Sequence, residues 1–237
     1  MVALLDCRAP RAIVEHLEQM GYQVCPMPVH PALPSPVSAH PDLLIFFGED
    51  AILSTKDYYS IAKKELDAIG KACGKELVLV EQTPSNVYPG DVLLNAAQMG
   101  EHLLCLPGAT AREILSRYSK EKLLPVRQGY AKCSVLPVTS SALITSDPSI
   151  ARVAAQKGLE VLQIEAGQIN LVGYDTGFIG GASSVSPYRN RDEILFCGDL
   201  DGHTDGPRIR EFCLSHQKKP IEIKGLPLTD VGTVFLI

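Results

Sequence analysis

The chain has 237 residues, of which 46% are hydrophobic and 21% charged, and its formal net charge is −5 at pH 7. This composition is typical of a globular protein that is long enough to bury a large core. The negative charge argues against broad binding to nucleic acids or to anionic membranes. No run of about 18 apolar residues is present, so we expect no membrane span. The first eight residues lack a basic segment followed by an apolar stretch, so we expect no signal peptide and a cytoplasmic protein.

The seven cysteines are scattered singly along the chain. Their number is odd and no Cys-x-x-Cys pair occurs, which favours reduced and mostly buried thiols over disulfides or a zinc site. The histidines outside the motif described below show no metal-ligand spacing. We therefore expect neither a metal nor a cofactor.

Apolar stretches alternate with amphipathic stretches along the chain, which predicts an α/β fold. Helices are expected at 10–20, 56–69, 110–118, 148–156 (capped by Asp147) and 207–216. Strands are expected at 2–5, 22–27, 42–47, 77–80, 91–95 paired with 102–106, 122–127, 133–137, 142–145, 160–164, 171–172, 178–179, 194–197, 220–223 and 233–237.

The five expected helices recur at intervals of roughly 40 to 55 residues, which is typical of a repeated architecture. A doubly wound parallel sheet needs one strand per helix, whereas about three strand segments flank each helix here. We therefore predict one domain over residues 1–237, built as a five-unit α/β propeller with mixed strand pairing.

Residues 198–212 carry the densest group of polar side chains. Asp199, Asp201, His203 and Asp205 lie within seven positions, directly before an expected helix. Carboxylates beside an imidazole can fix its tautomer and raise its basicity, as acid–base chemistry requires. The alternative is a helix N-terminus, in which Asp201 or Asp205 caps the helix.

Residues 201–212, Asp-Gly-His-Thr-Asp-Gly-Pro-Arg-Ile-Arg-Glu-Phe, resemble the Gly-His-x-Asp pattern of agmatine deiminases. These enzymes belong to the pentein superfamily of guanidino-group-modifying enzymes, which also includes amidinotransferases. The resemblance implies a pseudo-fivefold α/β propeller, with His203 as the catalytic histidine and Asp205 holding a guanidinium group. Residues 128–134, 177–183, 198–205 and 227–233 resemble an uncharacterised bacterial branch of the same fold.

One departure from the superfamily concerns the nucleophile. Its enzymes carry a nucleophilic cysteine in the last unit, close to the C-terminus. Residues 225–237 contain no cysteine, and the last one in the chain is Cys213, within an expected helix. Without a thiolate at that place, the covalent intermediate of these enzymes cannot form in the usual way.

Cys133 is the most suggestive remaining thiol, because an ammonium group at Lys132 could lower its pKa. Neighbours on a strand point to opposite faces, so a buried structural cysteine is the alternative. Asp230, before the last strand, could bind a cation or form a turn. Asn170, Asp91 and Asn95 could line a pocket where strands converge, or could be ordinary turn residues.

Two further stretches have simpler explanations. Residues 177–182 are glycine-rich but lack the Gly-Lys-Ser/Thr ending of a phosphate loop, so close backbone packing explains them better. The His40-Pro-Asp42 triplet has His-x-Asp spacing, and a proline-led entrance to a strand explains it equally well.

Two functions follow from these features. The first is an axial pocket for a small guanidino, amide or amino-acid-like ligand, with hydrolase-like activity. His203 would then be the acid–base group, Asp205 and Asp230 would hold a cation, and Cys133 would be the nucleophile. The alternative is a noncatalytic binding protein for a small ligand or a protein partner, since a ribosome anti-association factor shares the superfamily's fold.

Overall fold

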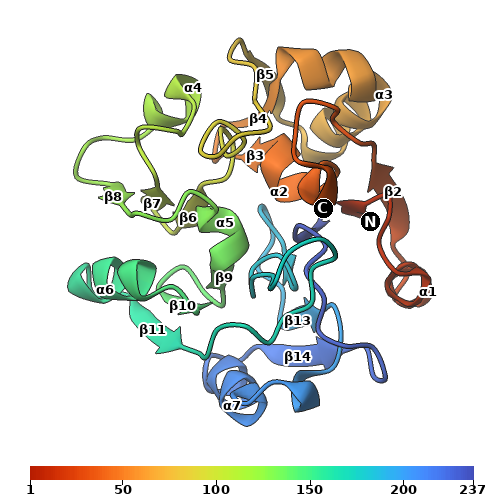
Figure 1. Cartoon of the computed structure of the whole chain (residues 1–237), viewed down its shortest axis with the longest axis vertical. Helices are drawn as coiled ribbons and strands as arrows, with labels where there is room; N and C mark the ends of the chain where they lie inside the picture. Colours follow the sequence, from red (N-terminus) through yellow and green to blue (C-terminus); the bar gives the residue numbers. More distant parts are fainter.

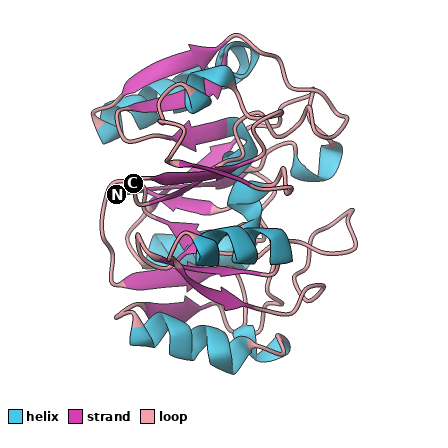
Figure 2. Ribbon diagram, turned by 90° about the vertical axis from the view of Figure 1, so that its left-hand side faces the viewer, coloured by secondary structure: helices cyan, strands magenta, loops and turns pink.

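Five small β-sheets make up the framework of the chain in the computed structural model, which describes residues 1–237. Figure 1 shows them distributed round the middle of the molecule, with longer helices such as α1, α3, α6 and α7 at the periphery and both chain ends near the centre. Figure 2, a view from the side, shows the strands stacked between these helices. The strands are β1 (Val2–Asp6), β2 (Gln23–Met27), β3 (Ile45–Phe47), β4 (Ala51–Thr55), β5 (Glu76–Val80), β6 (Ala97–Met99), β7 (His102–Cys105), β8 (Leu123–Pro125), β9 (Leu136–Pro137), β10 (Ala142–Thr145), β11 (Glu160–Gln163), β12 (Ser184–Val185), β13 (Glu193–Phe196), β14 (Lys219–Glu222) and β15 (Val234–Leu236).

Four of the sheets share one wiring. In β3–β4–β5, β6–β7–β8, β9–β10–β11 and β15–β1–β2, the middle strand is antiparallel to the first and parallel to the third. A helix connects the middle strand to the third each time, as a parallel pair requires. The fifth sheet is the parallel pair β13–β14. The C-terminal strand β15 thus completes the sheet that the N-terminal strand begins, and no single closed sheet forms.

Local sequence features explain where α6 begins and where α3 ends. Asp147 caps α6 by accepting hydrogen bonds from the backbone N–H groups of Ser149 (2.8 Å) and Ile150 (2.9 Å), as predicted. Helix α3 is followed by Gly74 in the left-handed conformation (φ 62°). The helices are α1 (Arg11–Gln19), α2 (Pro41–Leu44), α3 (Lys56–Cys73), α4 (Arg112–Leu115), α5 (Ala131–Ser134), α6 (Pro148–Gln156) and α7 (Gly206–Ser215), with 3₁₀ turns η1 (Ser35–Val37) and η2 (Leu200–Gly202).

Several expected strands are wrong, and most of them lie near the middle of the molecule. The stretch 42–47 begins as helix α2, because Pro41 suits the first turn of a helix. The stretch 133–137 is split between α5 and β9. The hairpin expected from 91–95 is instead formed by β6 and β7, with Gly100 in its turn (φ 56°).

The stretches 171–172 and 178–179 form no strand, and the helix expected at 110–118 is reduced to α4. Residues 177–181 are instead packed tightly against other backbone. A Cβ atom added to Gly180 would lie 2.3 to 2.6 Å from three carbonyl oxygens of residues 132–135. Close packing, as expected for this glycine-rich stretch, therefore takes the place of regular pairing.

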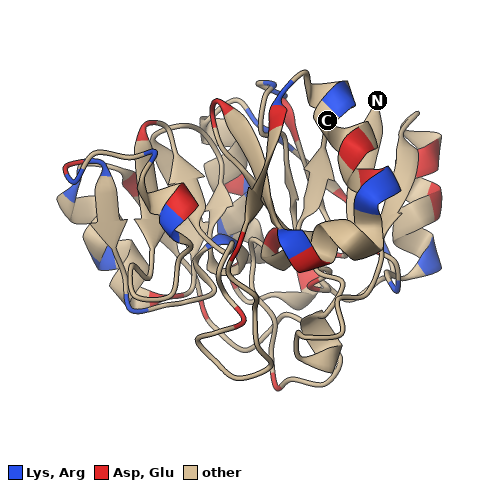
Figure 3. Cartoon of the chain, turned by 90° about the horizontal axis from the view of Figure 1, so that it is seen from above, with Lys and Arg blue, Asp and Glu red and all other residues tan.

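The surface carries both signs of charge. Figure 3 shows basic and acidic residues interspersed along the outer helices. No helix has the length and hydrophobicity needed to span a bilayer. Buried polar residues, in contrast, gather where the sheets meet, and some of them form the candidate site.

Candidate functional site

A group of buried polar side chains, here called the central polar cluster, joins segments that are far apart in the sequence. Each member is at most 7% exposed, although hydrophobic residues fill most of the interior. Burying so many polar groups is favourable only when they bond to one another. The cluster consists of Asp42, Asn95, Lys132, Cys133, Asp230 and Thr233.

Asn95 connects three segments of the cluster. Its side-chain oxygen accepts hydrogen bonds from the backbone N–H groups of Lys132 (2.8 Å) and Cys133 (3.3 Å). Its amide nitrogen lies 2.9 Å from the carbonyl oxygen of Asp42 and 3.1 Å from the Cys133 sulfur. The Asn95 side chain therefore provides hydrogen-bond partners both for two N–H groups in the first turn of α5 and for the carbonyl group of Asp42 in α2.

Thr233 joins the buried amine to a buried carboxylate. Its hydroxyl lies 3.0 Å from the Lys132 Nζ, which donates to it, and 2.7 Å from the Asp42 Oδ2. Thr233 also adopts a positive φ of 68°, which is unfavourable for a β-branched residue. Strained backbone of this kind persists where surrounding contacts enforce it, and it often marks functional regions.

Asp230 is held by backbone donors. Its two carboxylate oxygens accept from the N–H groups of Gly232 and Phe178, each at 2.9 Å. Burial raises the pKa of Asp230 above its ordinary value, and nearby His40 and the two N–H donors oppose that rise. Only glycine fits at Gly181, because a Cβ there would lie 2.0 Å from the Asp230 Oδ1.

A cavity of about 510 Å³, here called the His40 cavity, lies beside Asp230. Its lining includes two residues that the sequence suggested for a ligand site, Asp230 and Asn170. The ionisable side chains in its wall are those of Asp6, Arg8, His40 and Asp230.

The His40 ring lies between two carboxylates. Its Nδ1 is 3.8 Å from the Asp230 Oδ1, and its Nε2 is 3.8 Å from the Asp6 Oδ2. Arg8 pairs with both oxygens of Asp6, at 2.9 and 2.6 Å, and so neutralises that carboxylate. Asp230, in contrast, has no lysine or arginine partner in the cavity wall, and its hydrogen bonds come from backbone N–H groups. The arrangement therefore suits a small cation with hydrogen-bond donors, close to a group that can exchange a proton.

Cys133 lies next to this site and lines neither this cavity nor the one described later. Burial raises the pKa of its thiol well above 9, and the negative charges of Asp42 and Asp230 add to the rise. The helical turn α5 replaces the expected strand, and burial with the two carboxylates sets the direction of the pKa shift despite the neighbouring Lys132. A thiolate nucleophile at Cys133 is therefore disfavoured by its surroundings.

His203 and Asp205 occupy a different place. They line neither cavity, and the hydrogen bonds of their side chains go to each other, Glu165 and Arg208 and not to the central polar cluster. The His203 Nδ1 accepts from the Asp205 N–H at 3.0 Å, while its Nε2 is buried without a partner. Asp205 accepts from the Glu165 N–H at 2.7 Å and pairs with Arg208. The pair fastens the start of α7 to the segment after β11.

Asp199 and Asp201 do not face the imidazole as the sequence suggested. Arg210 and Lys224 form ion pairs with both carboxylates. Asp199 also accepts from the Asp201 N–H at 2.9 Å and so caps the turn η2. The acidic side chains of this stretch therefore belong to a local ion-pair network. Neither Asp201 nor Asp205 caps α7 with its side chain, so the capping alternative is wrong as well.

Asp91 is buried beside Tyr130, whose hydroxyl donates a hydrogen bond to it. Burial is the larger cause that raises the pKa of Tyr130, and the Asp91 carboxylate adds to the rise. Asp91 lines neither cavity. Of the four residues expected to line a pocket, Asp230 and Asn170 line the His40 cavity and Asn95 lies in the central polar cluster. Asp91 lies apart from both.

Six residues of the site were not among those expected from the sequence: Asp6, Arg8, His40, Asp42, Lys132 and Thr233. His40 and Lys132 carried a signal, since the His-x-Asp spacing at 40–42 and the lysine beside Cys133 were visible. Asp6 and Thr233 carried none, because their contacts join the two ends of the chain to its middle.

The comparisons with known proteins agree with this architecture. A solved structure of a DDAH from Pseudomonas aeruginosa, a cysteine-to-serine mutant complexed with citrulline, is similar with a TM-score of 0.52 and 10% sequence identity. The match covers 90% of this chain and 79% of that chain. The chain therefore has an α/β fold similar to that of this DDAH structure.

The chain belongs to DUF6873, a family of unknown function, whose model matches residues 4–235. The family thus extends over the first third of the chain, which the sequence motifs did not reach. No curated protein matches the sequence.

The buried histidine at the start of α7 predicts a pH dependence of stability. Burial lowers the pKa of His203, and Asp205 only partly opposes this. Because the unfolded chain then binds a proton more readily, stability is fully present above about pH 6.5 and falls as the pH drops below it. Between pH 7.5 and 5.5, the free energy of unfolding of His203→Asn should fall by up to about 1.4 kcal/mol less than that of the unaltered protein. Urea unfolding at the two pH values measures this difference. An unchanged pH dependence in the variant would contradict this assignment. His16→Asn, on the outer helix α1, is the matched control.

The seven cysteines should differ sharply in reactivity. We expect iodoacetamide at pH 8 to modify exposed Cys7 in the native protein at least about 100-fold faster than buried Cys133, because burial raises the pKa of the Cys133 thiol and blocks access. Peptide mass spectrometry resolves the two sites, and all seven cysteines should react in guanidinium chloride. Comparable native rates for Cys7 and Cys133 would show that Cys133 is an accessible thiolate.

Proposed function

We propose that the His40 cavity binds a small ligand with a guanidino, amide or amino-acid-like group, and that the protein hydrolyses such a ligand. The observation that carries this proposal is the placement of His40 between Asp230 and Asp6 in the wall of a 510 Å³ cavity. We place this cavity on the axis of a five-unit α/β propeller of the pentein type. In this proposal the family is a bacterial branch of the superfamily that lacks the C-terminal cysteine.

The charges of the wall support a cationic ligand. Arg8 neutralises Asp6, whereas Asp230 keeps free acceptor capacity on both oxygens beside its two backbone donors. A planar guanidinium or amidinium group can donate to both oxygens of one carboxylate. Asn170, exposed at the cavity, offers a neutral donor and acceptor for the other end of the ligand. The citrulline in the similar DDAH structure belongs to the same chemical class of ligand.

Hydrolysis here would use water in place of a thiolate. His40 would take a proton from a water molecule as that water attacks the amidine or amide carbon. The C–N bond would then break, and the leaving amine would take the proton from the imidazole. His203 and Asp205 play no part in this mechanism, because they line neither cavity.

A noncatalytic binding protein is the second candidate. The buried state of Cys133 and the absence of a cysteine from residues 225–237 favour it, since neither supplies a thiolate to the cavity. Binding and turnover must therefore be measured separately.

Calorimetric titration with agmatine, L-arginine, L-citrulline and L-glutamine tests the binding. We expect at least one of them to bind, and Asp230→Asn to weaken it at least about tenfold by removing the carboxylate. Asp67→Asn, on the exposed face of α3, is the matched control and should not change the affinity. Val172→Trp, at a position 79% exposed on the cavity rim, should also weaken binding and tests the cavity if Asp230→Asn does not fold. No binding by the whole panel, or equal binding by all variants, would contradict the proposal.

Turnover is measured with the ligand that binds, as release of ammonia or amine. If product forms and His40→Asn abolishes it while binding stays within about threefold, hydrolysis is supported. If the ligand binds and no product forms, the hydrolase part is wrong and the binding-protein alternative holds.

A further inference from the structure

A second cavity, of about 310 Å³ and here called the Lys132 cavity, shares no lining residue with the His40 cavity. Most of its wall is apolar, with phenylalanine, leucine, isoleucine and valine side chains. Lys132 is the one ionisable residue among the 16 that line it. Its electrostatic character is therefore opposite to that of the His40 cavity, where carboxylates lie in the wall.

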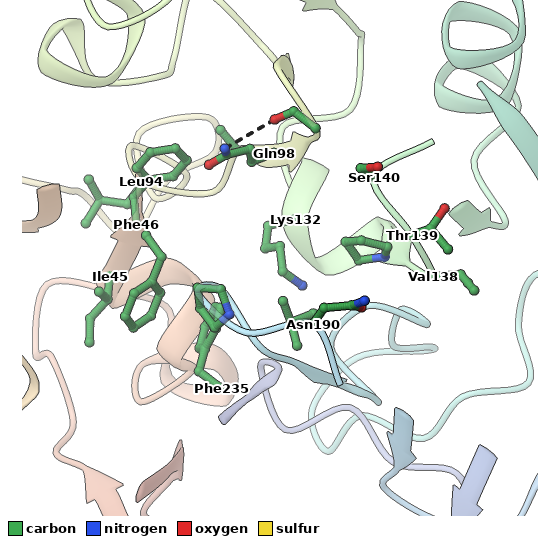
Figure 4. A pocket seen from close by; sticks show the side chains of 16 residues that line it. Ile45, Phe46, Leu94, Gln98, Lys132, Val138, Thr139, Ser140, Asn190 and Phe235 are labelled. Carbon is green, nitrogen blue, oxygen red and sulfur yellow. Dashed lines mark hydrogen bonds between the residues drawn. The ribbon is translucent and has the colours of Figure 1, made fainter. Parts of the chain in front are cut away.

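The Lys132 amine is buried and incompletely bonded. The residue is 7% exposed, and its Nζ donates one hydrogen bond, to Thr233, out of the three that an ammonium can make. The Nζ also lies 5.7 Å from the centre of the Phe235 ring. It forms no direct ion pair, and its link to the Asp42 carboxylate runs through the Thr233 hydroxyl. Figure 4 shows the side chain extending from α5 among the lining residues, with its nitrogen towards Phe235 and Asn190.

The rim of the cavity adds donors and no acid. The Asn190 side-chain oxygen accepts from Lys218 at 2.6 Å, which leaves the Asn190 amide N–H groups for other partners. Thr139 and Ser140, from the segment after β9, contribute hydroxyl groups to the wall (Figure 4). A ligand placed here meets one buried cation, several neutral donors and an apolar wall.

We infer that the Lys132 cavity binds a small monocarboxylate with an apolar body, whose carboxylate accepts the free hydrogen bonds of Lys132. A charge-assisted hydrogen bond in a site shielded from water is strong and selects against neutral ligands of the same shape. The apolar walls select against small, strongly hydrated anions in the same way. Burial lowers the pKa of Lys132, and a carboxylate ligand would stabilise the charged amine.

Phenylacetate is the probe, and phenylacetamide is its neutral match of similar shape. In calorimetric titrations at pH 7 and low ionic strength, we expect phenylacetate to bind at one site and phenylacetamide to bind at least about tenfold more weakly. Lys132→Met should weaken phenylacetate at least about tenfold, and Lys64→Met, at an exposed position on α3, should leave its affinity unchanged.

A measurement on the unaltered protein covers the case in which Lys132→Met does not fold. Methyl resonances of Leu94, Val138 and Val185, which line the cavity, should shift on addition of phenylacetate, while those of the remote Val14 should not. Equal affinities for phenylacetate and phenylacetamide, absence of phenylacetate binding, or shifts confined to residues outside the cavity would each overturn the inference.

Discussion

The centre of this protein depends on the side chain of one asparagine. Asn95 is fully buried and supplies partners to the carbonyl of Asp42 and to the N–H groups of Lys132 and Cys133. The chain turns helical for only four residues at α2 and at α5, so these backbone groups have few partners of their own. An apolar residue at 95 would leave them unpaired in the interior, at a cost of about 1–3 kcal/mol each. The short helical turns that replace two expected strands are thus compatible with burial because of this amide.

The two cavities differ in charge because the ionisable groups around the Asn95 amide are distributed unevenly between them. Thr233 couples Lys132 to Asp42, while Asp230 and His40 face the other cavity. Burying an isolated charge is costly, whereas a charge joined to an opposite charge through a hydrogen-bonded hydroxyl is tolerated. The cluster can therefore present an amine to one cavity and carboxylates to the other within a small volume. The two proposed ligand classes, a cation in one cavity and a carboxylate in the other, rest on this distribution of charge.

The outer parts of the fold could be predicted from the sequence, because they depend on local patterns. The periodicity of α1, α3 and α6 and the Asp147 cap involve residues a few positions apart. The centre depends on contacts such as Lys132 with Thr233 and Thr233 with Asp42, which are 101 and 191 residues apart in the chain. No local pattern indicates such a contact. The stretch 199–205 has a conspicuous local pattern that suggested a functional site. Its acidic residues instead form ion pairs with Arg210 and Lys224, which explains them structurally.

The coupling between Lys132 and Asp42 tests the account of the centre most directly. Urea unfolding of Lys132→Met, Asp42→Asn and the double variant gives their interaction free energy. We predict a double variant less destabilised than the sum of the single ones, by about 1 kcal/mol or more, because each single change leaves the other buried charge without its counterpart. Lys132→Met combined with Asp67→Asn, on the outer face of α3, should be additive within about 0.5 kcal/mol. Additive effects for Lys132 and Asp42 would contradict the account, because the two charges would then be stabilised independently.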